Sequence, residues 1–502
     1  MTDTLTTYTL TTDTPITDTL TTDTLFMHHS KLLHLLKVLD APELKRLSRF
    51  LKSPFYNTNP HLIKLYQLLR KEHPQFDSSK LAKEKVFKKL FPGLDYDHQK
   101  LLNLMTDFTA LLKQYLKALQ LEKEEPVQER LLLKAFAERP HSYDIFVKHV
   151  QKTGRRLDAL PYRNIYFYRE KFWLSQLYFN HPGTDKFQLS KAEYDASMQQ
   201  LDRWFLLEKL LLSCEMKARE KPLSEVYDIW LLSEIREAAT RFPAERSIAG
   251  AYLEMLNLLE KGEVTAYFQL KGLMLEHLHQ FTRRQQQHML ESLINYAIRQ
   301  GNQGKEDFLR ESLELYQFGL AGRLFLEYEI LNDMVYINVV NIALRAGEAT
   351  WCRQFIDQYA PFLEPRAQKD AQSLATALWL YAEQQPAATI DLLQKVEFLN
   401  VYYQIQARVL LLKVYFEAFR EDDGYFELTL SQAEAFERYL RRNRQVSEAQ
   451  SESLLNFTLT VKRLAKLKQS NALHWQARAA LKPELQALSP LYNRSWLLLQ
   501  LE

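Results

Sequence analysis

The chain has 502 residues, and its 65 basic and 62 acidic side chains nearly cancel, so the net charge of +3 predicts no general affinity for nucleic acids or membrane surfaces. It contains only 12 glycines, which disfavours folds that cradle dinucleotides or phosphates in glycine-rich turns. Its two cysteines, Cys214 and Cys352, form neither a metal-binding spacing nor a disulfide framework. No apolar run approaches the roughly 18 residues of a membrane helix. We therefore expect a cytoplasmic protein.

Residues 1–27 differ in composition from the rest of the chain. The tripeptide Thr-Asp-Thr recurs between Thr2 and Thr24, and the segment holds too few apolar residues to build a core. We predict a disordered, threonine-rich tail, with Met27 as a candidate for the true start of the protein. A tail that is phosphorylated or glycosylated on its threonines is the alternative.

Residues 28–125 predict a compact module of four helices. The first begins with the capping-box sequence Asp40-Ala-Pro-Glu43, and the second begins at Asn59, which is followed by proline. The third is rich in lysine and runs from Lys80 to Leu90. The fourth begins near Asp95 and carries apolar residues in steps of three and four, which is the pattern of one buried helix face.

Three segments of this module resemble the N-terminal signature of an uncharacterised helical family from Bacteroidota. They read FLKSPFYNTNPHLIKLYQLL, KEKVFKKLFPG and YDHQKLLNLMTDF. The resemblance covers the module, and it extends to the rest of the chain only in length and helical character. It implies an all-helical fold, and it implies no site residue because the family has no assigned activity.

Residues 126–444 predict an array of helical repeats. Glycine and proline breaks recur about every 40 residues, a period typical of stacked helical hairpins. The breaks fall at Pro140, Gly183, Pro222, Gly262, Gly304, Gly347, Gln385-Pro386 and Gly424. We therefore predict a right-handed α-solenoid, tetratricopeptide-like but degenerate, which residues 445–502 close with two capping helices, 445–469 and 475–502.

The clearest repeat unit spans residues 323–364. Apolar residues at helical spacing predict a helix that begins at Tyr328 and is covered on both faces, and Gly347 ends it. A shorter amphipathic helix containing Trp351 and Cys352 follows. We expect Cys352 to be buried where the two helices cross.

The first candidate binding site is a stripe of aromatic and arginine residues. Tyr162, Tyr166, Arg169 and Trp173 share one helical face, and these residue types are the usual anchors of protein interfaces. The alternative is that most of these rings pack inside the array. We expect at most two or three of the eight aromatic residues between positions 162 and 179 to be exposed.

The second candidate is a basic face formed by Lys80, Lys83, Lys88 and Lys89. The turn that follows resembles that of a DNA-binding helix-turn-helix. However, the helix after it opens with Asp95 and an aspartate two residues later, which would repel phosphate groups. A solvated lysine face is therefore the favoured interpretation.

No residue pattern predicts catalysis, a cofactor or a metal site. His277 and His279 lie close to Glu276, but they are two residues apart and would point to different faces of a helix. We expect a non-enzymatic scaffold that binds a protein or peptide on its concave surface, without a cofactor and without a membrane anchor. The alternatives are a nucleic-acid-binding regulator that uses the basic module and a hydrolase without a recognisable motif. The partner's identity and the oligomeric state stay open.

Overall fold

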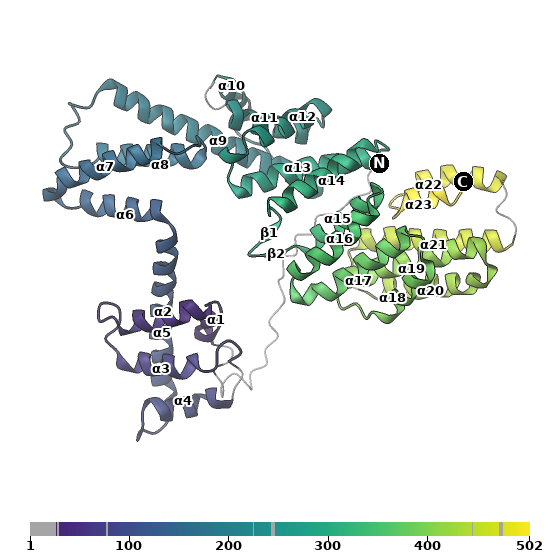
Figure 1. Ribbon diagram of the computed structural model, residues 1–502, viewed down its shortest axis with the longest axis horizontal. Helices are drawn as coiled ribbons and strands as arrows, with labels where there is room; N and C mark the ends of the chain where they lie inside the picture. Colours follow the sequence, from purple (N-terminus) through teal and green to yellow (C-terminus); the bar gives the residue numbers. More distant parts are fainter. Residues whose placement is uncertain are drawn as a thin grey trace. The chain divides into compact units, whose positions relative to one another are not determined.

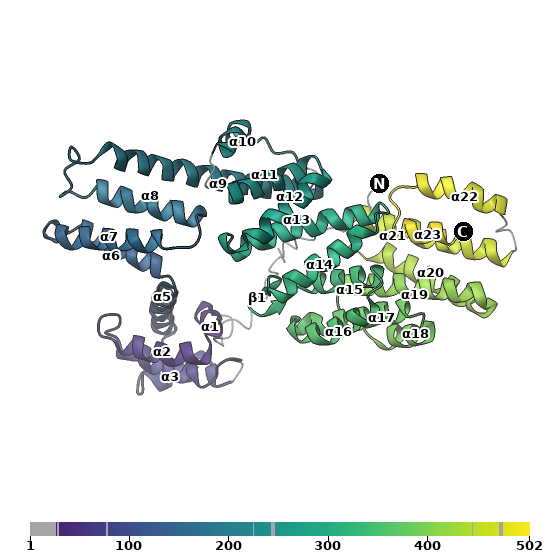
Figure 2. The same cartoon turned by 45° about the horizontal axis from the view of Figure 1, so that its top comes forward.

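The computed structural model describes residues 27, 30–76, 79–223, 225–241, 246–443, 445–470 and 475–501. These residues form 23 α-helices and one two-stranded sheet (Figure 1, Figure 2). The predicted all-α class is confirmed, since 78% of the chain is helical. The predicted threonine-rich tail lies outside the described residues apart from Met27, which is fully buried. None of the described helices is both long enough and apolar enough to cross a membrane.

Contacts between residues divide the chain into two compact units. The first unit contains the described residues up to Ala159 together with Glu170–Met198. The second contains Leu160–Arg169 and the described residues from Gln199 onward. Two helices contribute residues to both units, namely α8 (Ile165–Phe179) and α9 (Lys191–Leu223).

The first unit begins with five helices that share one hydrophobic core. They are α1 (Lys31–Lys37), α2 (Ala41–Lys52), α3 (Pro60–Arg70), α4 (Lys83–Leu90) and α5 (His98–Lys123), with a 3₁₀ turn, η1, at Ser79–Leu81. The unit continues with α6 (Glu125–Ala137), a 3₁₀ turn at Pro140–Ser142 (η2) and α7 (Tyr143–Asp158).

Local capping signals set the starts of these helices. Asp40 Oδ1 accepts a hydrogen bond from the backbone N–H of Glu43 at 2.7 Å, and Glu43 Oε2 accepts one from the N–H of Asp40 at 3.2 Å. The predicted capping box is therefore confirmed, as is the start at Asn59, whose side chain accepts from His61 N–H. The prediction missed α1, although Ser30 caps it and three of its leucines are buried.

In the second unit, each helix from α10 to α21 packs on the next (Figure 1). For example, α15 contacts both α16 and α17, and α17 contacts both α18 and α19. The elements after α9 are α10 (Leu232–Thr240), α11 (Arg246–Glu260), α12 (Val264–Glu276), η4 (Leu278–Gln280), α13 (Arg283–Asn302), α14 (Asp307–Ala321), β1 (Leu326–Glu327), β2 (Ile330–Leu331), α15 (Asp333–Arg345), α16 (Ala349–Tyr359), η5 (Ala360–Phe362), α17 (Pro365–Ala382), α18 (Pro386–Lys395), α19 (Val401–Glu421), η6 (Asp423–Tyr425), α20 (Phe426–Arg442), α21 (Glu448–Gln469), α22 (Trp475–Ala487) and α23 (Arg494–Leu499).

The predicted glycine and proline breaks coincide with the turns between helices, with one exception. Gly347, for example, has a φ of 80° and lies between α15 and α16. Gly304 has a φ of 90° and lies between α13 and α14. Glycine adopts this left-handed conformation without strain, which ends a helix cleanly. The exception is Pro222, which falls in the last turn of α9.

Two predicted helices have different bounds in the structure. The helix expected from Tyr328 begins only at Asp333, because Tyr328 and Glu329 take left-handed φ angles of 50° and 67° and form the turn of the β1–β2 hairpin. The helix expected over residues 475–502 is divided into α22 and α23, and Pro490 lies in the break between them. Proline lacks the N–H that a continuous helix would need there.

The prediction for Cys352 is confirmed. Its side chain is 0% exposed, and the thiol Sγ lies 3.9 Å from the backbone oxygen of Val340 on the neighbouring helix α15. The cysteine therefore occupies the crossing of α15 and α16, where a small side chain allows the two helices to approach.

Candidate functional site

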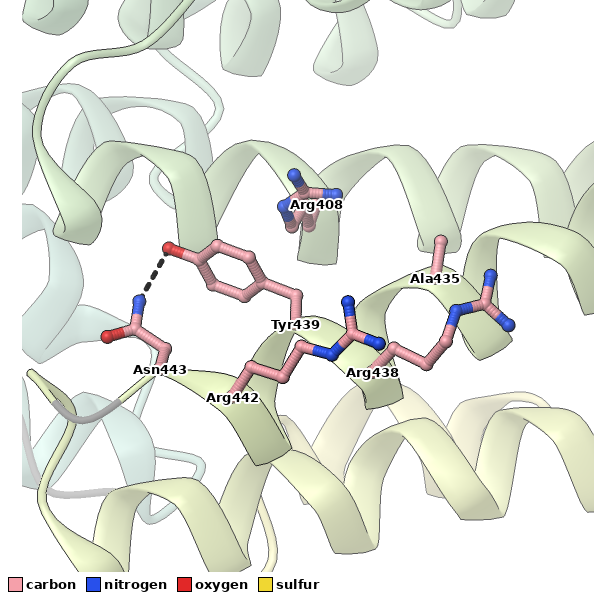
Figure 3. Close-up of a pocket in the computed structure, with 6 residues that line it drawn as sticks. All are labelled: Arg408, Ala435, Arg438, Tyr439, Arg442 and Asn443. Atoms are coloured by element: carbon pink, nitrogen blue, oxygen red, sulfur yellow. Dashed lines mark hydrogen bonds between the residues drawn. The ribbon is translucent and has the colours of Figure 1, made fainter.

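Three arginines line an open pocket of about 530 Å³ on the surface of α19 and α20 (Figure 3). We call this site the arginine pocket. Its residues are Arg408 from α19, Ala435, Arg438, Tyr439 and Arg442 from α20, and Asn443 directly after α20.

The helical repeat of α20 places these side chains on one face. Arg438, Tyr439 and Arg442 lie three, four and seven positions after Ala435, which is the spacing of neighbours on a helix surface. The core face of the same helix is apolar, and its buried residues include Phe436. Burial of that face against α19 and α21 therefore leaves the arginine-bearing face on the surface.

Tyr439 forms the centre of the pocket. The guanidinium group of Arg408 lies 4.5 Å from the centre of the Tyr439 ring. The tyrosine hydroxyl donates a hydrogen bond to Gln404 Oε1 at 2.7 Å and accepts one from Asn443 Nδ2 at 2.9 Å. Figure 3 shows the latter bond, with Arg442 next along α20 and Arg438 pointing away from the ring. The two hydrogen bonds fix the hydroxyl end of Tyr439, and Arg408 is positioned by a cation–π contact with its ring.

The carboxylates near the pocket are engaged by other cations. Glu437 accepts hydrogen bonds from Arg441, one turn further along α20. Glu434 lies 3.0 Å from Lys462 Nζ, and this hydrogen bond lowers the pKa of the Glu434 carboxyl. Within the described residues, no carboxylate lies within 4.0 Å of the guanidinium groups of Arg408, Arg438 or Arg442.

Helix electrostatics explains only part of this arrangement. Arg442 lies in the last turn of α20, where a cation stabilises the helix dipole by about 0.3–1 kcal/mol. Arg438 lies one turn earlier, and a like-charge pair at this spacing costs about 0.2–0.5 kcal/mol in an isolated helix. Arg408 lies in the middle of α19, away from either end. The clustering of the three charges is therefore not required by the stability of α20.

The predicted aromatic stripe is only partly assembled. Tyr162 precedes α8, and its ring centre is 6.4 Å from that of Tyr166. Arg169 lies over the Tyr166 ring at 5.8 Å. Trp173 is 44% exposed, whereas the other seven aromatic residues of this segment are buried or half-buried. The expectation that at most two or three of them are exposed is thus confirmed.

The predicted basic face does not form one surface. Lys83 is buried in the first turn of α4, where it shares the helix face of the buried Val86, Phe87 and Leu90. Lys80, Lys88 and Lys89 are exposed, and Lys80 Nζ lies 3.7 Å from Glu72. Of the two predicted acidic residues that follow, Asp97 caps α5 by accepting the N–H of Lys100.

A half-buried lysine forms a second polar cluster that the sequence did not reveal. Lys413 Nζ lies 4.9 Å from the ring centre of Tyr381 and 5.4 Å from that of Trp496. Both aromatic residues donate to Glu417 Oε1, at 2.7 and 2.6 Å. Burial lowers the pKa of the Lys413 ammonium to about 8, and the charge of Glu417 opposes this shift. The cluster joins α17, α19 and α23.

The arginine pocket also escaped the sequence prediction. Its one local signal is the run Arg438-Tyr-Leu-Arg-Arg-Asn, whereas Arg408 lies 30 positions earlier. Among the described residues, no group of three histidine, cysteine or acidic side chains is arranged to hold a metal ion. His277, from the histidine cluster considered above, lies 3.7 Å from Glu276.

Comparison with protein families, with curated proteins and with solved structures found no match to this chain. The geometry of the described residues is therefore the basis on which a function is proposed.

Proposed function

We propose that this protein is a non-enzymatic helical-repeat scaffold that binds a partner protein, and that the arginine pocket holds an anionic segment of that partner. The observation that carries the proposal is the presence of three guanidinium groups around one open pocket without a carboxylate partner among the described residues.

The order of the helices supports the scaffold part of the proposal. Consecutive helices from α10 to α21 pack on one another, and the turns between them recur at the period seen in the sequence. We interpret them as the stacked hairpins of a tetratricopeptide-like, right-handed α-solenoid. Such stacks present extended concave surfaces, and binding of a peptide or protein is their usual function.

The chemistry of the pocket supports an anionic partner. Guanidinium groups bind carboxylates and phosphates through paired N–H donors, which makes arginine the preferred residue at such sites. The three arginines have no ion-pair partner within 4.0 Å among the described residues, although the charge of Glu434 interacts with Arg438 at longer range. Their mutual repulsion is relieved when an anion enters. The described lining contains arginine, alanine, tyrosine and asparagine side chains, which are suited to binding charge rather than to proton transfer.

A peptide-binding experiment tests this proposal. The probe is a fluorescein-labelled peptide, Gly-Ser-Glu-Glu-Ser-Gly, with the Gln-Gln peptide as its neutral counterpart. We expect the acidic peptide to bind the wild-type chain at 0.15 M salt and the neutral peptide to bind at least tenfold more weakly. The triple variant Arg408→Gln, Arg438→Gln, Arg442→Gln should lose at least tenfold in affinity for the acidic peptide, equivalent to about 1.4 kcal/mol.

The control is a second triple variant with the same change in net charge. Arg241, Arg353 and Arg463 pair with nearby acids and do not line the pocket, so Arg241→Gln, Arg353→Gln, Arg463→Gln should change the affinity less than twofold. Equal losses of affinity in the two triple variants would show that peptide binding depends only on the overall charge of the protein. Equal binding of the acidic and neutral peptides would also contradict the proposal.

A further inference from the structure

We propose that the arginine pocket recognises a phosphorylated serine or threonine in the partner protein. This inference rests on the proposed function and narrows it from an anionic segment to one dianionic group. Its support comes from the three arginines that line one pocket, from a further donor on Asn443 and from the acidic residues that border the pocket.

The three guanidinium groups surround a single pocket rather than a long groove. Arg438 and Arg442 are neighbours one turn apart on α20, and Arg408 enters from α19 above the ring of Tyr439 (Figure 3). A phosphate ester carries a charge of about −1.5 to −2 at neutral pH and offers three terminal oxygens. One carboxylate offers two oxygens and a single charge. A phosphate therefore matches three arginines that line one pocket better than one acidic side chain does.

Asn443 supplies a further donor at the edge of the pocket. Its amide Nδ2 donates one hydrogen bond to the Tyr439 hydroxyl, and its Oδ1 accepts from the N–H of Gln445. An amide nitrogen carries two N–H groups. Among the described residues, the second N–H of Asn443 has no acceptor, so it is available to a ligand oxygen.

Two features favour an isolated phosphate over a polyanionic chain such as RNA. First, Arg408 already covers one face of the Tyr439 ring, so a base cannot stack on that face. Second, Glu434 and Glu437 lie on the same helix as the pocket. A chain of phosphates leaving the pocket along α20 would approach these carboxylates, whereas a single phosphoserine between neutral residues would not.

The volume of the pocket is consistent with a phosphorylated peptide. About 530 Å³ lies within the range of roughly 300–1,000 Å³ that is typical of ligand pockets. This volume exceeds that of a phosphate group alone, which leaves space for the side chain and backbone that carry it.

Three peptides that differ only in their central residue test the inference. They are the phosphoserine, glutamate and serine forms of Gly-Ser-Ala-Xaa-Ala-Ser-Gly, measured by fluorescence anisotropy on the full chain at pH 7.5 and 0.15 M salt. We expect the phosphoserine peptide to bind at least tenfold more tightly than the glutamate peptide. Its affinity should fall as the pH is lowered from 7.5 to 5.5, because the second pKa of a phosphate ester is near 6.

Two variants connect this binding to the pocket. Arg408→Gln should abolish the preference for phosphoserine over glutamate. Arg408→Lys, which keeps the charge but not the paired donors, should reduce the preference by several-fold. Circular dichroism of each variant checks that the helical fold is retained.

The outcomes distinguish failure of the inference from failure of the proposed function. If the glutamate peptide binds as tightly as the phosphoserine peptide, and both bind more tightly than the serine peptide, the pocket binds anionic segments without discriminating phosphate from carboxylate. If all three bind alike, the proposed function fails as well. Competition by inorganic phosphate at concentrations equal to the peptide's Kd would identify a free-phosphate site. Tighter binding of a six-nucleotide RNA would identify nucleic acid as the ligand instead.

Discussion

Removal of the carboxylate of Asp370 should loosen the start of α19, the helix that carries Arg408. Asp370 lies on α17 and is only 2% exposed. Its Oδ2 accepts hydrogen bonds from the backbone N–H groups of Leu399 at 2.8 Å and Asn400 at 3.1 Å. Asn400 is in turn the N-cap of α19. One side chain therefore ties the beginning of α19 to α17.

The expected loss of stability follows from these two bonds. A hydrogen bond to a charged group contributes about 1.5–3 kcal/mol, and the two bonds share one oxygen. We therefore expect Asp370→Ala to destabilise this region by about 2–4 kcal/mol. Asp370→Asn retains a carbonyl oxygen of the same shape without its charge, so its cost should be smaller, about 1 kcal/mol.

Amide hydrogen exchange is the appropriate measurement, because it reports the stability of one segment within a stack of helices. At tenfold per 1.4 kcal/mol, amides at the start of α19 should exchange about 30-fold faster or more in Asp370→Ala. The control is Asp391→Ala on α18, since Asp391 is exposed and, among the described residues, pairs only with Lys395, at 2.7 Å. An exposed pair of this kind contributes about 0.3–0.5 kcal/mol. If Asp370→Ala accelerates exchange no more than the control does, the two hydrogen bonds do not hold α19 in place.

Three further predictions concern other parts of the chain. Cys352→Leu should overpack the crossing of α15 and α16 and lower the free energy of unfolding in urea by about 1–3 kcal/mol, with a milder effect for Cys352→Ala. Burial raises the pKa of the Cys352 thiol to about 12, so rapid thiol labelling of the native protein would contradict this placement. Because burial lowers the pKa of Lys413 to about 8 from 10.5, the unfolded chain binds more protons between these values, so the stability of the wild type should rise with pH across this window. Lys413→Met should remove that rise, and parallel stability curves for the two proteins would refute it. Finally, the four lysines of the predicted basic face should support only weak binding of duplex DNA, with a Kd no better than about 10⁻⁴ to 10⁻⁶ M at physiological salt. Sub-micromolar, salt-sensitive binding that disappears when all four lysines are changed to glutamate would favour the nucleic-acid alternative.

Signals within a few residues were sufficient to predict much of the secondary structure. The capping box of Asp40 and Glu43 links residues three positions apart, so its hydrogen bonds form whenever the local chain becomes helical. Gly347 ends α15 for a similarly local reason, because glycine accepts a left-handed φ without strain. The burial of Cys352 followed from the spacing of apolar residues in the same unit.

At other positions, the structure differs from the one that the apolar spacing of the sequence predicts. The apolar spacing around Tyr328 suits a helix, yet Tyr328 and Glu329 form a hairpin turn in which two non-glycine residues take positive φ. The β1–β2 pairing and the capping of α15 by Asn332 accompany that turn. By contrast, the burial of Lys83 was open to prediction, because its spacing to the apolar Val86, Phe87 and Leu90 places it on their helix face.

The amino-acid sequence by itself determined the helical class, most helix ends and the regular spacing of the turns, because these depend on hydrogen bonds and apolar faces within one helix or one turn. Only the tertiary structure brought Arg408 over Tyr439 and Asp370 under the start of α19, pairs separated by about 30 positions. It also decided which acidic residues pair with which cations. Glu434 and Glu437 pair with Lys462 and Arg441, and this choice is what leaves the arginines of the pocket without a carboxylate. The Glu437–Arg441 pair lies within α20 at helical spacing, so the sequence alone could have suggested it. The Glu434–Lys462 pair joins α20 to α21, so it depends on the packing of these two helices, and no single helix contains the information for it.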